Sequence, residues 1–403
     1  MRILVLSLGV PFPPIGGGLT RTYHLLEALS PHHEVVLAAF EYGDAHDPPP
    51  FPIEIERVPW RWSQPYLDMI GGDPAARARA YNHLAFDSGD PWFVSALDPS
   101  AMDELLVRVL RNRFDLILLE GAPLARFLGR LPSHVPRVLD LFDVHSLMTQ
   151  RDVEVGAPAD REALSREAKR TLAWERHAAE NTSHCLTVSN EEAAVARELL
   201  HAASVHVVPN GVDTEFFAPR GGHSQKSALL FTGRMNYEPN ADAAVYAAEK
   251  ILPVVRQQVP GATLHVVGAN PTPKVSALAS DAVAVYGRVE DVRPHHQNAE
   301  VVIVPVRKGG GTRLKVLEAA AAGKAIVSTT LGVEGLAFRP GRDVLVADTP
   351  ESLAAAVVSL LGDPGRRAEL GAHARTVACR YDWKGIGVDF RKLIERFIRD
   401  ARN

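Results

Sequence analysis

A stretch of glycines and charged residues in the second half of the chain has the composition of a phosphate-binding turn. Three consecutive glycines, Gly309 to Gly311, follow an apolar run that ends at Pro305, and a helical pattern begins directly after them. Glycines let an anion approach the backbone closely, and the free N–H groups of a helix N-terminus attract negative charge. Arg313 and Lys315 add positive charge there. The residues expected to bind an anionic ligand are Gly310, Gly311, Thr312 and Arg313.

One carboxylate lies close to this turn in the sequence. Glu318 follows Lys315 by three residues, which places both side chains on roughly the same face of the expected helix. A carboxylate at that position can accept hydrogen bonds from ribose hydroxyls. The alternative is a tight turn followed by surface charges, but three glycines and three charged residues within ten positions favour a ligand site.

Two further turns have related chemistry. Gly16 to Gly18 follow the first apolar run, and their backbone amides form a second candidate anion site. A plain turn does not need three glycines, because each adds unfolded-state entropy that folding must overcome. Gly233 and Arg234 follow an expected strand, where ligands of α/β sheets bind. Arg234 can contact a diphosphate through two parallel N–H groups, although an arginine in a surface turn is the common alternative.

Missing motifs exclude several other chemistries. The sequence has no Walker lysine loop, no HExxH, no CxxC and no nucleophile elbow. A GxGxxG motif after the first strand is also absent, which argues against a nicotinamide dehydrogenase. No suitably spaced aspartate pair is present to hold a metal-bound diphosphate. We therefore expect no metal and no cofactor.

Composition narrows the setting of the protein. The net charge of −4 gives no basic field for nucleic acid. No run reaches the ~20 apolar residues of a membrane span, although peripheral contact with a membrane stays open. The apolar run after Arg2 is too short for a signal peptide and is better explained as a buried strand. Two cysteines far apart in the sequence fit a reducing, cytoplasmic location.

The candidate turns require two parallel sheets to position them. Runs of Val, Ile and Leu alternate with helical segments in both halves of the chain, as in sheets with crossover helices. A length of 403 residues suits two such α/β domains. Strands are expected at Ile3–Leu8, Glu34–Phe40, Ile53–Val58, Asp115–Glu120, Val138–Phe142, His184–Val188, Val205–Val208, Ala228–Thr232, Thr263–Val267, Val283–Tyr286, Val301–Pro305, Ala325–Ser328 and Asp343–Val346. Helices are expected at Thr20–Leu29, Met102–Arg111, Asp160–Glu180, Asn190–Leu200, Ala241–Gln258, Asp291–Asn298, Thr312–Ala322, Pro350–Leu361 and Lys384–Ile398.

Residues 41 to 100 break this alternation because they are rich in proline and aromatic residues. One interpretation is an irregular covered insertion. The other is an acceptor-binding surface, since aromatic rings stack on sugars and lipid-like groups.

The candidate turns, taken together, resemble the large retaining glycosyltransferase family of GT-B architecture, known as family 4 or glycosyl transferases group 1. The resemblance covers nearly the whole chain and is carried by Gly16–Gly18, Thr187–Ser189, Val208–Asp213, Gly233–Arg234, Gly287–Val289 and Gly309–Glu318. It implies an α/β fold with two Rossmann-like domains that face each other across a cleft. Residues 1–215, completed by a C-terminal helix at 384–403, correspond to the acceptor domain, and residues 216–383 correspond to the nucleotide-sugar domain.

The resemblance also implies roles for individual residues. The donor is a nucleotide-diphosphate sugar, most commonly a UDP-sugar, and the anomeric configuration is retained. Glu318 matches the second glutamate of the family's E-x7-E pair, which binds the ribose. Arg288 and Val289 match the segment that contacts the base, and Arg234 matches the diphosphate arginine. His145, which follows a first-domain strand, is the candidate for the family's catalytic-region histidine; a core or surface histidine is the alternative.

The sequence departs from the family pattern at two places. Gly310 stands where the first glutamate of the pair is expected, and Pro239 and Asn240 stand where a lysine is expected. We expect Lys315 to supply the missing charge, so that Arg234, Lys315 and His145 form the catalytic set. The alternatives are a nucleotide-sugar 2-epimerase of the same fold and a non-catalytic subunit that binds nucleotide sugar. The acceptor, whether saccharide, lipid-linked or small molecule, is not specified by these residues.

Overall fold

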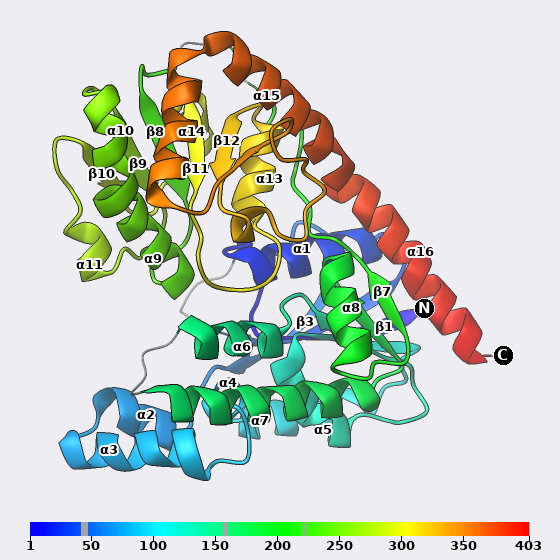
Figure 1. Cartoon of the computed structure of the whole chain (residues 1–403). Helices are drawn as coiled ribbons and strands as arrows, with labels where there is room; N and C mark the ends of the chain where they lie inside the picture. Colours follow the sequence, from blue (N-terminus) through cyan, green and yellow to red (C-terminus); the bar gives the residue numbers. More distant parts are fainter. Residues whose placement is uncertain (42–46, 156–159, 220, 222–223, 403) are drawn as a thin grey trace. The chain divides into compact units, whose positions relative to one another are not determined.

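The chain forms two compact α/β units. The computed structural model describes residues 1–41, 47–155, 160–219, 221 and 224–402, and Figure 1 draws the chain as a ribbon. Unit 1 comprises Met1–Pro209 and Gly387–Asn403, and unit 2 comprises Asn210–Ile386. Residues 220 and 222–223, close to the expected domain boundary at 215/216, and residues 42–46 of the aromatic-rich insertion lie outside the described residues.

Unit 1 is built on a parallel sheet of seven strands in the order β3-β2-β1-β4-β5-β6-β7. The central strands β1 and β4 are almost entirely buried, as parallel strands covered on both faces must be. The strand order reverses between β1 and β4, and α/β sheets bind ligands beyond the carboxyl ends of strands at such a reversal. The strands are β1 (Arg2–Ser7), β2 (Glu34–Glu41), β3 (Glu54–Pro59), β4 (Leu116–Glu120), β5 (Arg137–Leu141), β6 (His184–Thr187) and β7 (Val205–Val207).

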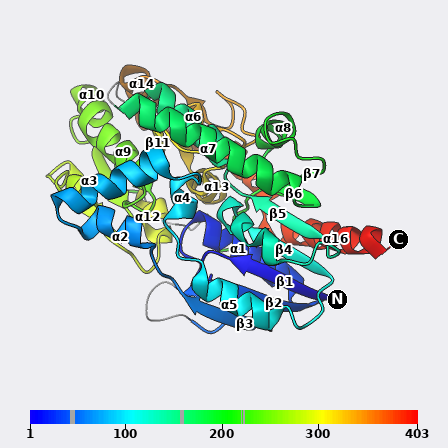
Figure 2. The same ribbon diagram turned by 90° about the horizontal axis from the view of Figure 1, so that it is seen from below.

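Helices cover both faces of this sheet. Figure 2 shows α5 beside β2 and β3, and α8 packs on β6 and β7. The helices are α1 (Gly17–Leu29), α2 (Gln64–Gly71), α3 (Pro74–Asn82), α4 (Trp92–Ser95), α5 (Ser100–Val109), α6 (His145–Val155), α7 (Arg161–Glu180) and α8 (Asn190–Glu198), with a π-helical turn η1 (His83–Asp87) and a 3-10 segment η2 (Ala122–Arg130).

The last helix of the chain, α16 (Trp383–Arg402), returns to unit 1 through its residues from Gly387 onward. Its Phe390, Ile394 and Phe397 are buried. The ring of Phe397 stacks on that of His184, which begins β6, with 3.7 Å between centroids. Burial of an aromatic side chain contributes about 1.5–3 kcal/mol, so this helix is an integral part of unit 1.

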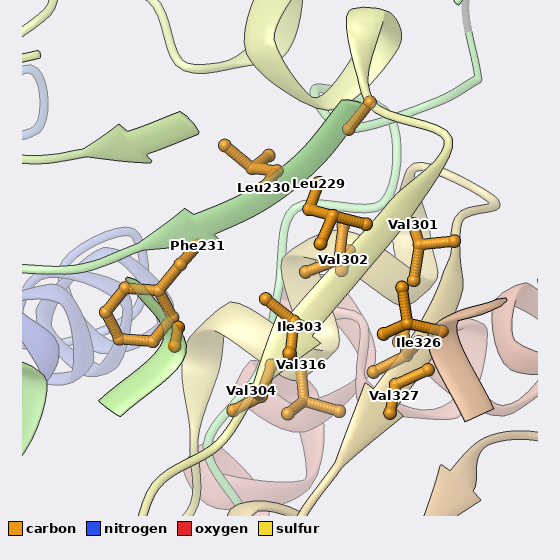
Figure 3. Close-up of a cluster of buried hydrophobic side chains, with 14 of the residues drawn as sticks. Leu229, Leu230, Phe231, Val301, Val302, Ile303, Val304, Val316, Ile326 and Val327 are labelled. Carbon is orange, nitrogen blue, oxygen red and sulfur yellow. The ribbon is translucent and has the colours of Figure 1, made fainter. Parts of the chain in front are cut away.

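Unit 2 repeats the plan with six parallel strands in the order β10-β9-β8-β11-β12-β13. Its core, drawn in Figure 3, brings Leu229–Phe231 of β8 and Val301–Val304 of β11 together with Val316 of α13. The order reverses between β8 and β11. The strands are β8 (Ala228–Thr232), β9 (Thr263–Val267), β10 (Val283–Tyr286), β11 (Val301–Val304), β12 (Ala325–Ser328) and β13 (Leu345–Val346).

The helices of unit 2 lie between these strands, and α13 and α14 pack on β11 and β12. The helical segments are α9 (Glu238–Tyr246), η4 (Ala247–Ile251), α10 (Leu252–Gln258), α11 (Pro273–Ser276), α12 (Arg293–Asn298), α13 (Leu314–Ala321), η5 (Leu331–Val333), α14 (Pro350–Gly362), α15 (Pro364–Ala378) and η6 (Cys379–Tyr381).

The expected α/β class is confirmed, and each expected strand lies within two residues of its predicted bounds. The helices agree less well. The predicted helix at 241–258 is divided by the π-helical turn η4, which precedes Pro253, a residue without an N–H to donate. Residues 41 to 100, for which an irregular insertion is one of the two interpretations, contain α2 and α3, each with a proline in its first turn, where a proline favours helix formation.

Candidate functional site

The candidate site of unit 2 lies where its strand order reverses. The turn after β8 carries Gly233 and Arg234, and the turn after β11 carries the three glycines. Gly309 and Gly311 have φ values of 99° and 66°, a left-handed conformation that glycine adopts without strain. α13 begins at Leu314, two residues later than predicted, so Lys315 is its second residue.

The turn after β8 is held closely against its neighbour. Gly233 donates its N–H to the carbonyl of Val267 at 3.0 Å, and a side chain at Gly268 would collide with the Gly233 carbonyl. Arg234 is exposed, and no described residue forms a hydrogen bond or ion pair with its guanidinium. The backbone of this turn is therefore fixed, while the guanidinium of Arg234 is available to bind an anionic ligand.

Asn240 joins the two turns through both ends of its side-chain amide. Its Nδ2 donates to the carbonyl of Arg234 at 3.0 Å, and its Oδ1 accepts from Lys315 Nζ at 2.5 Å. A Cβ at Gly233 would lie 2.7 Å from Asn240 Nδ2 and 2.8 Å from Lys315 Nζ, so a side chain there would displace both groups, and the φ of 154° also favours glycine. The structure thus brings the predicted residues Arg234 and Lys315 into one cluster.

Burial makes the charge of Lys315 responsive to its surroundings. Its ammonium lies 4.4 Å from the centroid of the Phe231 ring. Burial and the charge of Arg313 lower the pKa of Lys315 to about 7, although Glu318 opposes them. Burial raises the pKa of Glu318 to about 6 against the opposing charge of Lys315. A bound anion would favour the charged lysine, so ligand binding and protonation are coupled here.

Arg313 and Thr312 are used mainly to shape the glycine turn. The guanidinium of Arg313 donates to the carbonyls of Gly310 and Gly311, and to that of Gly309 at 3.3 Å. Thr312 Oγ1 accepts a hydrogen bond from Asn210 Nδ2 at 3.0 Å. Direct donor contacts by Gly310, Gly311, Thr312 and Arg313 stay predictions.

Two ion pairs tie the beginning of the glycine turn to α9. Arg307 forms a bidentate pair with Asp242, at 3.0 and 2.7 Å, and Lys308 contacts Glu238 at 2.6 Å. A Cβ at Gly309 would lie 3.3 Å from Pro239. Both pairs are partly exposed and contribute little to stability, but they fix where the turn leaves β11.

The predicted base-contacting residues lie further along the same sheet. Arg288 and Val289 follow β10, which is separated from β8 by β9. Arg288 is exposed, whereas Val289 packs partly buried against the core of unit 2. They share the carboxyl edge with the Arg234 cluster, and their contact with a base stays a prediction.

In unit 1 the corresponding turn begins a long helix. Gly16 has φ 91° and precedes α1, whose first residues are Gly17 and Gly18. The backbone amides of this helix end remain a candidate anion site. Phe142 lies beneath the turn: a Cβ at Gly18 would meet its ring at 3.4 Å, and one at Gly121 at 3.2 Å. The part of Gly16 to Gly18 in donor binding stays a prediction.

A buried ion pair fixes α1 below that turn. Arg21 and Asp140 are fully buried, with Arg21 Nε and Nη2 donating to the carboxylate at 2.6 and 3.0 Å. Arg21 Nη1 also donates to the carbonyl of Val208 at 2.8 Å. Next to this pair, Glu120 accepts from Thr22 at 3.2 Å, and burial together with the negative charge of Asp140 raises its pKa.

His145 lies at the start of α6 beside a buried carboxylate that the sequence interpretation missed. Glu175 accepts the backbone N–H groups of His145 and Ser146 at 2.8 and 2.9 Å, and lies 3.5 Å from His145 Nδ1. Burial opposes charge on the ring, but Glu175 and Asp143 outweigh it and raise the pKa of His145. The ring packs against Phe93 with 4.7 Å between centroids. Glu175 therefore fixes the backbone at the start of α6 and lies beside the ring, but the geometry gives no hydrogen bond between Glu175 and His145 Nδ1 among the described residues.

Several partners of the predicted residues carry no signal of that contact in the sequence. Asn240 stands out only as the replacement of a lysine, and nothing in the sequence marks Glu175 as a neighbour of His145. The spacing of Lys315 relative to Asn240, 75 positions along the chain, contains no signal for their contact.

The described residues also bear on metal binding and membrane spanning. No group of three or more His, Cys, Asp or Glu side chains there could hold a metal ion. Within the same residues, no helix has the length and apolar character needed to cross a membrane. The expected independence from metal stays a prediction.

Comparison with known families decides the classification. The profile described as Glycosyltransferase Family 4 matches residues 15–216, which is half of the chain, and the profile described as Glycosyl transferases group 1 matches residues 226–363. The chain belongs to glycosyltransferase family 4.

Relatives of this family 4 member have varied substrates. It is 28% identical to a D-inositol 3-phosphate glycosyltransferase of Kineococcus radiotolerans over 64% of its own length and 66% of that protein. A GDP-mannose-dependent mannosyltransferase of Mycolicibacterium smegmatis is 29% identical, with 50% of this chain and 58% of that protein covered. A glycogen synthase of Mycobacterium tuberculosis is 28% identical over 96% and 92% of the two chains. The chain thus spans somewhat less than two thirds of the first two relatives.

Solved structures agree on the fold of this family 4 member. A sucrose-phosphate synthase from Thermosynechococcus elongatus superposes with a TM-score of 0.71 at 18% identity, covering 99% and 100% of the two chains. HepE of Anabaena in complex with UDP-glucose gives 0.65 at 13% identity, covering 98% and 100%. These likenesses establish the GT-B glycosyltransferase fold.

Proposed function

We propose that this protein transfers a sugar from a nucleoside-diphosphate sugar to an acceptor hydroxyl, with retention of configuration and without a metal ion. The observation that carries the proposal is the cluster of Arg234 and Lys315 at the strand-order reversal of unit 2, held by one asparagine. Both cations lie where a ligand of an α/β sheet binds. Glu318, on the same helix as Lys315, would hold the ribose.

The chemistry follows from where charge develops. When the bond between the anomeric carbon and the diphosphate oxygen breaks, the diphosphate gains negative charge, and the acceptor oxygen forms the new bond as its proton is released. Lys315, held by Asn240, and the first amides of α13 are positioned to stabilise that charge, and the exposed guanidinium of Arg234 is available to join them. One such donor is typically worth about 2.7–4 kcal/mol of barrier. His145, whose ring lies beside the buried Glu175, is the proposed acceptor-side group in unit 1.

The donor and acceptor are proposed at the level of chemical class. UDP-glucose is bound in the HepE structure, while one relative is described as GDP-mannose-dependent, so UDP- and GDP-sugars are the first donors to test.

The acceptor is a hydroxyl compound. Stacked aromatic rings of unit 1, with 4.4 Å between the centroids of Trp62 and Tyr66, are the proposed contact surface for a sugar or lipid-linked group. Cys185 and Cys379 are both free, which favours a cytoplasmic location.

A labelled-donor assay tests the proposal. The full-length protein is incubated with UDP- and GDP-sugars, with and without a cell extract that supplies acceptors. A glycosyltransferase releases nucleoside diphosphate and moves the label only when acceptor is present. Conversion of the donor sugar alone indicates an epimerase, and retention of bound, unchanged donor indicates a binding subunit; either result contradicts the proposal.

We expect activity to survive chelation, because fixed cations of the chain replace a divalent ion at the diphosphate. Turnover with saturating donor is measured before and after dialysis against EDTA. A preserved rate is the expected result. Loss of the rate that magnesium or manganese restores would show that the diphosphate needs a metal.

We expect Glu318→Gln to weaken donor binding by about tenfold, since a hydrogen bond to a charged group contributes roughly 1.5–3 kcal/mol. The variant keeps the shape of the side chain but loses its charge. Donor affinity is measured by calorimetry, with the fold checked by circular dichroism. Glu369→Gln, an exposed glutamate on α15 of the same unit, is the matched control and should bind as wild type. Normal affinity of Glu318→Gln would make Glu318 a helix-surface residue only.

A further inference from the structure

A cavity in unit 2 lies apart from the Arg234 cluster. It has a volume of about 180 Å³ and is lined by the segment 217–219, by α12 and by the residues that lead into β12. Lys324 immediately precedes β12, so the cavity lies at the amino edge of the sheet, whereas the glycine turn follows the carboxyl ends. A cavity of this size holds several water molecules (about 30 Å³ each in the liquid) or a small ion.

The wall of this cavity contains a buried histidine whose polar atoms are unused. His296 is 1% exposed, and neither ring nitrogen has a hydrogen-bond partner among the described residues. Its ring packs edge-on against Phe217, with 5.8 Å between centroids. Burial and the neighbouring Lys324 charge lower the pKa of His296 to about 3, so the ring is neutral and carries one N–H donor. Buried polar groups in folded proteins nearly always have a partner, so this ring is suited to a ligand or ordered water.

Two cations line the same cavity and favour an anion over water. Lys324 donates two of its three N–H groups to the carbonyls of Gln297 and Ala299, at 2.9 and 3.0 Å, which leaves a third. Arg293 uses Nε for both oxygens of Asp291, at 2.8 and 3.0 Å. Its guanidinium also stacks on the Phe216 ring, with 3.8 Å from Cζ to the centroid, and none of the described residues accepts a hydrogen bond from its Nη atoms.

We propose that Arg293, Lys324 and His296 form a binding site for a small oxyanion of the phosphate class, at the opposite edge of the unit 2 sheet from the donor turns. The site goes beyond the proposed transfer reaction and does not depend on it. An oxyanion there accepts hydrogen bonds from the two cations and from the neutral imidazole. A phosphomonoester or inorganic phosphate bound at this place would stabilise unit 2.

Thermal unfolding in the presence of inorganic phosphate tests the site. Phosphate should raise the melting temperature of the full-length wild-type protein more than sodium chloride at equal ionic strength does. Because phosphate can also bind at the diphosphate turns, the same titration is run on Arg234→Ala, where the rise should persist. Arg293→Gln should weaken the apparent phosphate affinity by about tenfold or more. Arg366→Gln, an exposed arginine on α15 outside the cavity, should behave as wild type.

His296→Phe separates ligand binding from a structural role. Replacing an unsatisfied buried polar group by an apolar ring of similar shape should leave the phosphate-free melting temperature unchanged or higher. The same variant should lose the phosphate-dependent rise. The proposal is overturned if phosphate acts no better than chloride, or if the rise disappears in Arg234→Ala but survives in Arg293→Gln and His296→Phe.

Discussion

Lys315→Ala is expected to slow sugar transfer by about 10²-fold or more at saturating donor, the size typical of removing one group that stabilises transition-state charge. The reason lies in the geometry of unit 2. Lys315 is the partly buried cation next to the exposed Arg234, and Pro239 and Asn240 offer no charge where the family pattern has a lysine. Without it, only Arg234 and backbone amides oppose the charge on the leaving diphosphate.

Asn240→Ala is the decisive comparison. Asn240 carries no charge and positions Lys315 rather than replacing it, so this variant should slow turnover much less than Lys315→Ala. Lys274→Ala, an exposed lysine on α11 of the same unit, controls for loss of charge and should keep the wild-type rate. A near-normal rate for Lys315→Ala, or greater damage from Asn240→Ala, would refute this account of the diphosphate site.

The lowered pKa of Lys315 allows a second, independent test of its role. At a pH above about 7, the pKa of Lys315, this side chain is mainly neutral in the ligand-free protein. A bound diphosphate favours its charged form. Binding of nucleoside diphosphate at pH 8 should therefore take up as much as about one proton, and affinity should fall as the pH rises above 7. Calorimetry in two buffers of different ionisation enthalpy measures the uptake, which Lys315→Met should lack.

Arg21→Met should destabilise unit 1 by about 3–5 kcal/mol, because it leaves the carboxylate of Asp140 buried without its partner. Both side chains are fully buried and joined by two hydrogen bonds. Urea unfolding monitored by circular dichroism gives the change in free energy.

The double variant Arg21→Met/Asp140→Leu removes both charges and should recover most of that loss, since apolar groups can replace a buried pair at little cost. Arg166→Met breaks an exposed pair with Glu162 on α7 and should cost less than about 1 kcal/mol. A small effect of Arg21→Met, similar to that of Arg166→Met, would show that Asp140 is satisfied without the arginine.

The strands were predictable because their signal is local. Runs such as Val301–Val304 are apolar at every position, as strands buried on both faces require, and they were found where expected. Glycines at the strand ends also indicate the turns locally. Where two backbone segments approach as closely as Gly233 and Gly268 do, there is no room for a side chain. The prolines of α2 and α3 misled the prediction because the same residue that breaks a helix interior also starts a helix.

The contacts that join these turns required the fold itself. Asn240 and Lys315 are far apart in sequence, and only the adjacency of β8 and β11 brings their elements together. Glu175 contacts His145 across α6 and α7, although nothing in the spacing of a long charged helix distinguishes this glutamate from its exposed neighbours. The sequence therefore indicated the charged residues but not the groups that orient them.

The return of α16 to unit 1 has a consequence for biosynthesis. Residues 387–403 belong to unit 1 but emerge from the ribosome only after all of unit 2, so unit 2 is in effect an insertion within the sequence of unit 1. A nascent chain can form unit 2 before Phe397 has been synthesised, and until then the ring of His184 lacks the aromatic side chain that stacks on it. Quality control during translation would therefore encounter unit 1 as the late-maturing part, although its sheet is synthesised first.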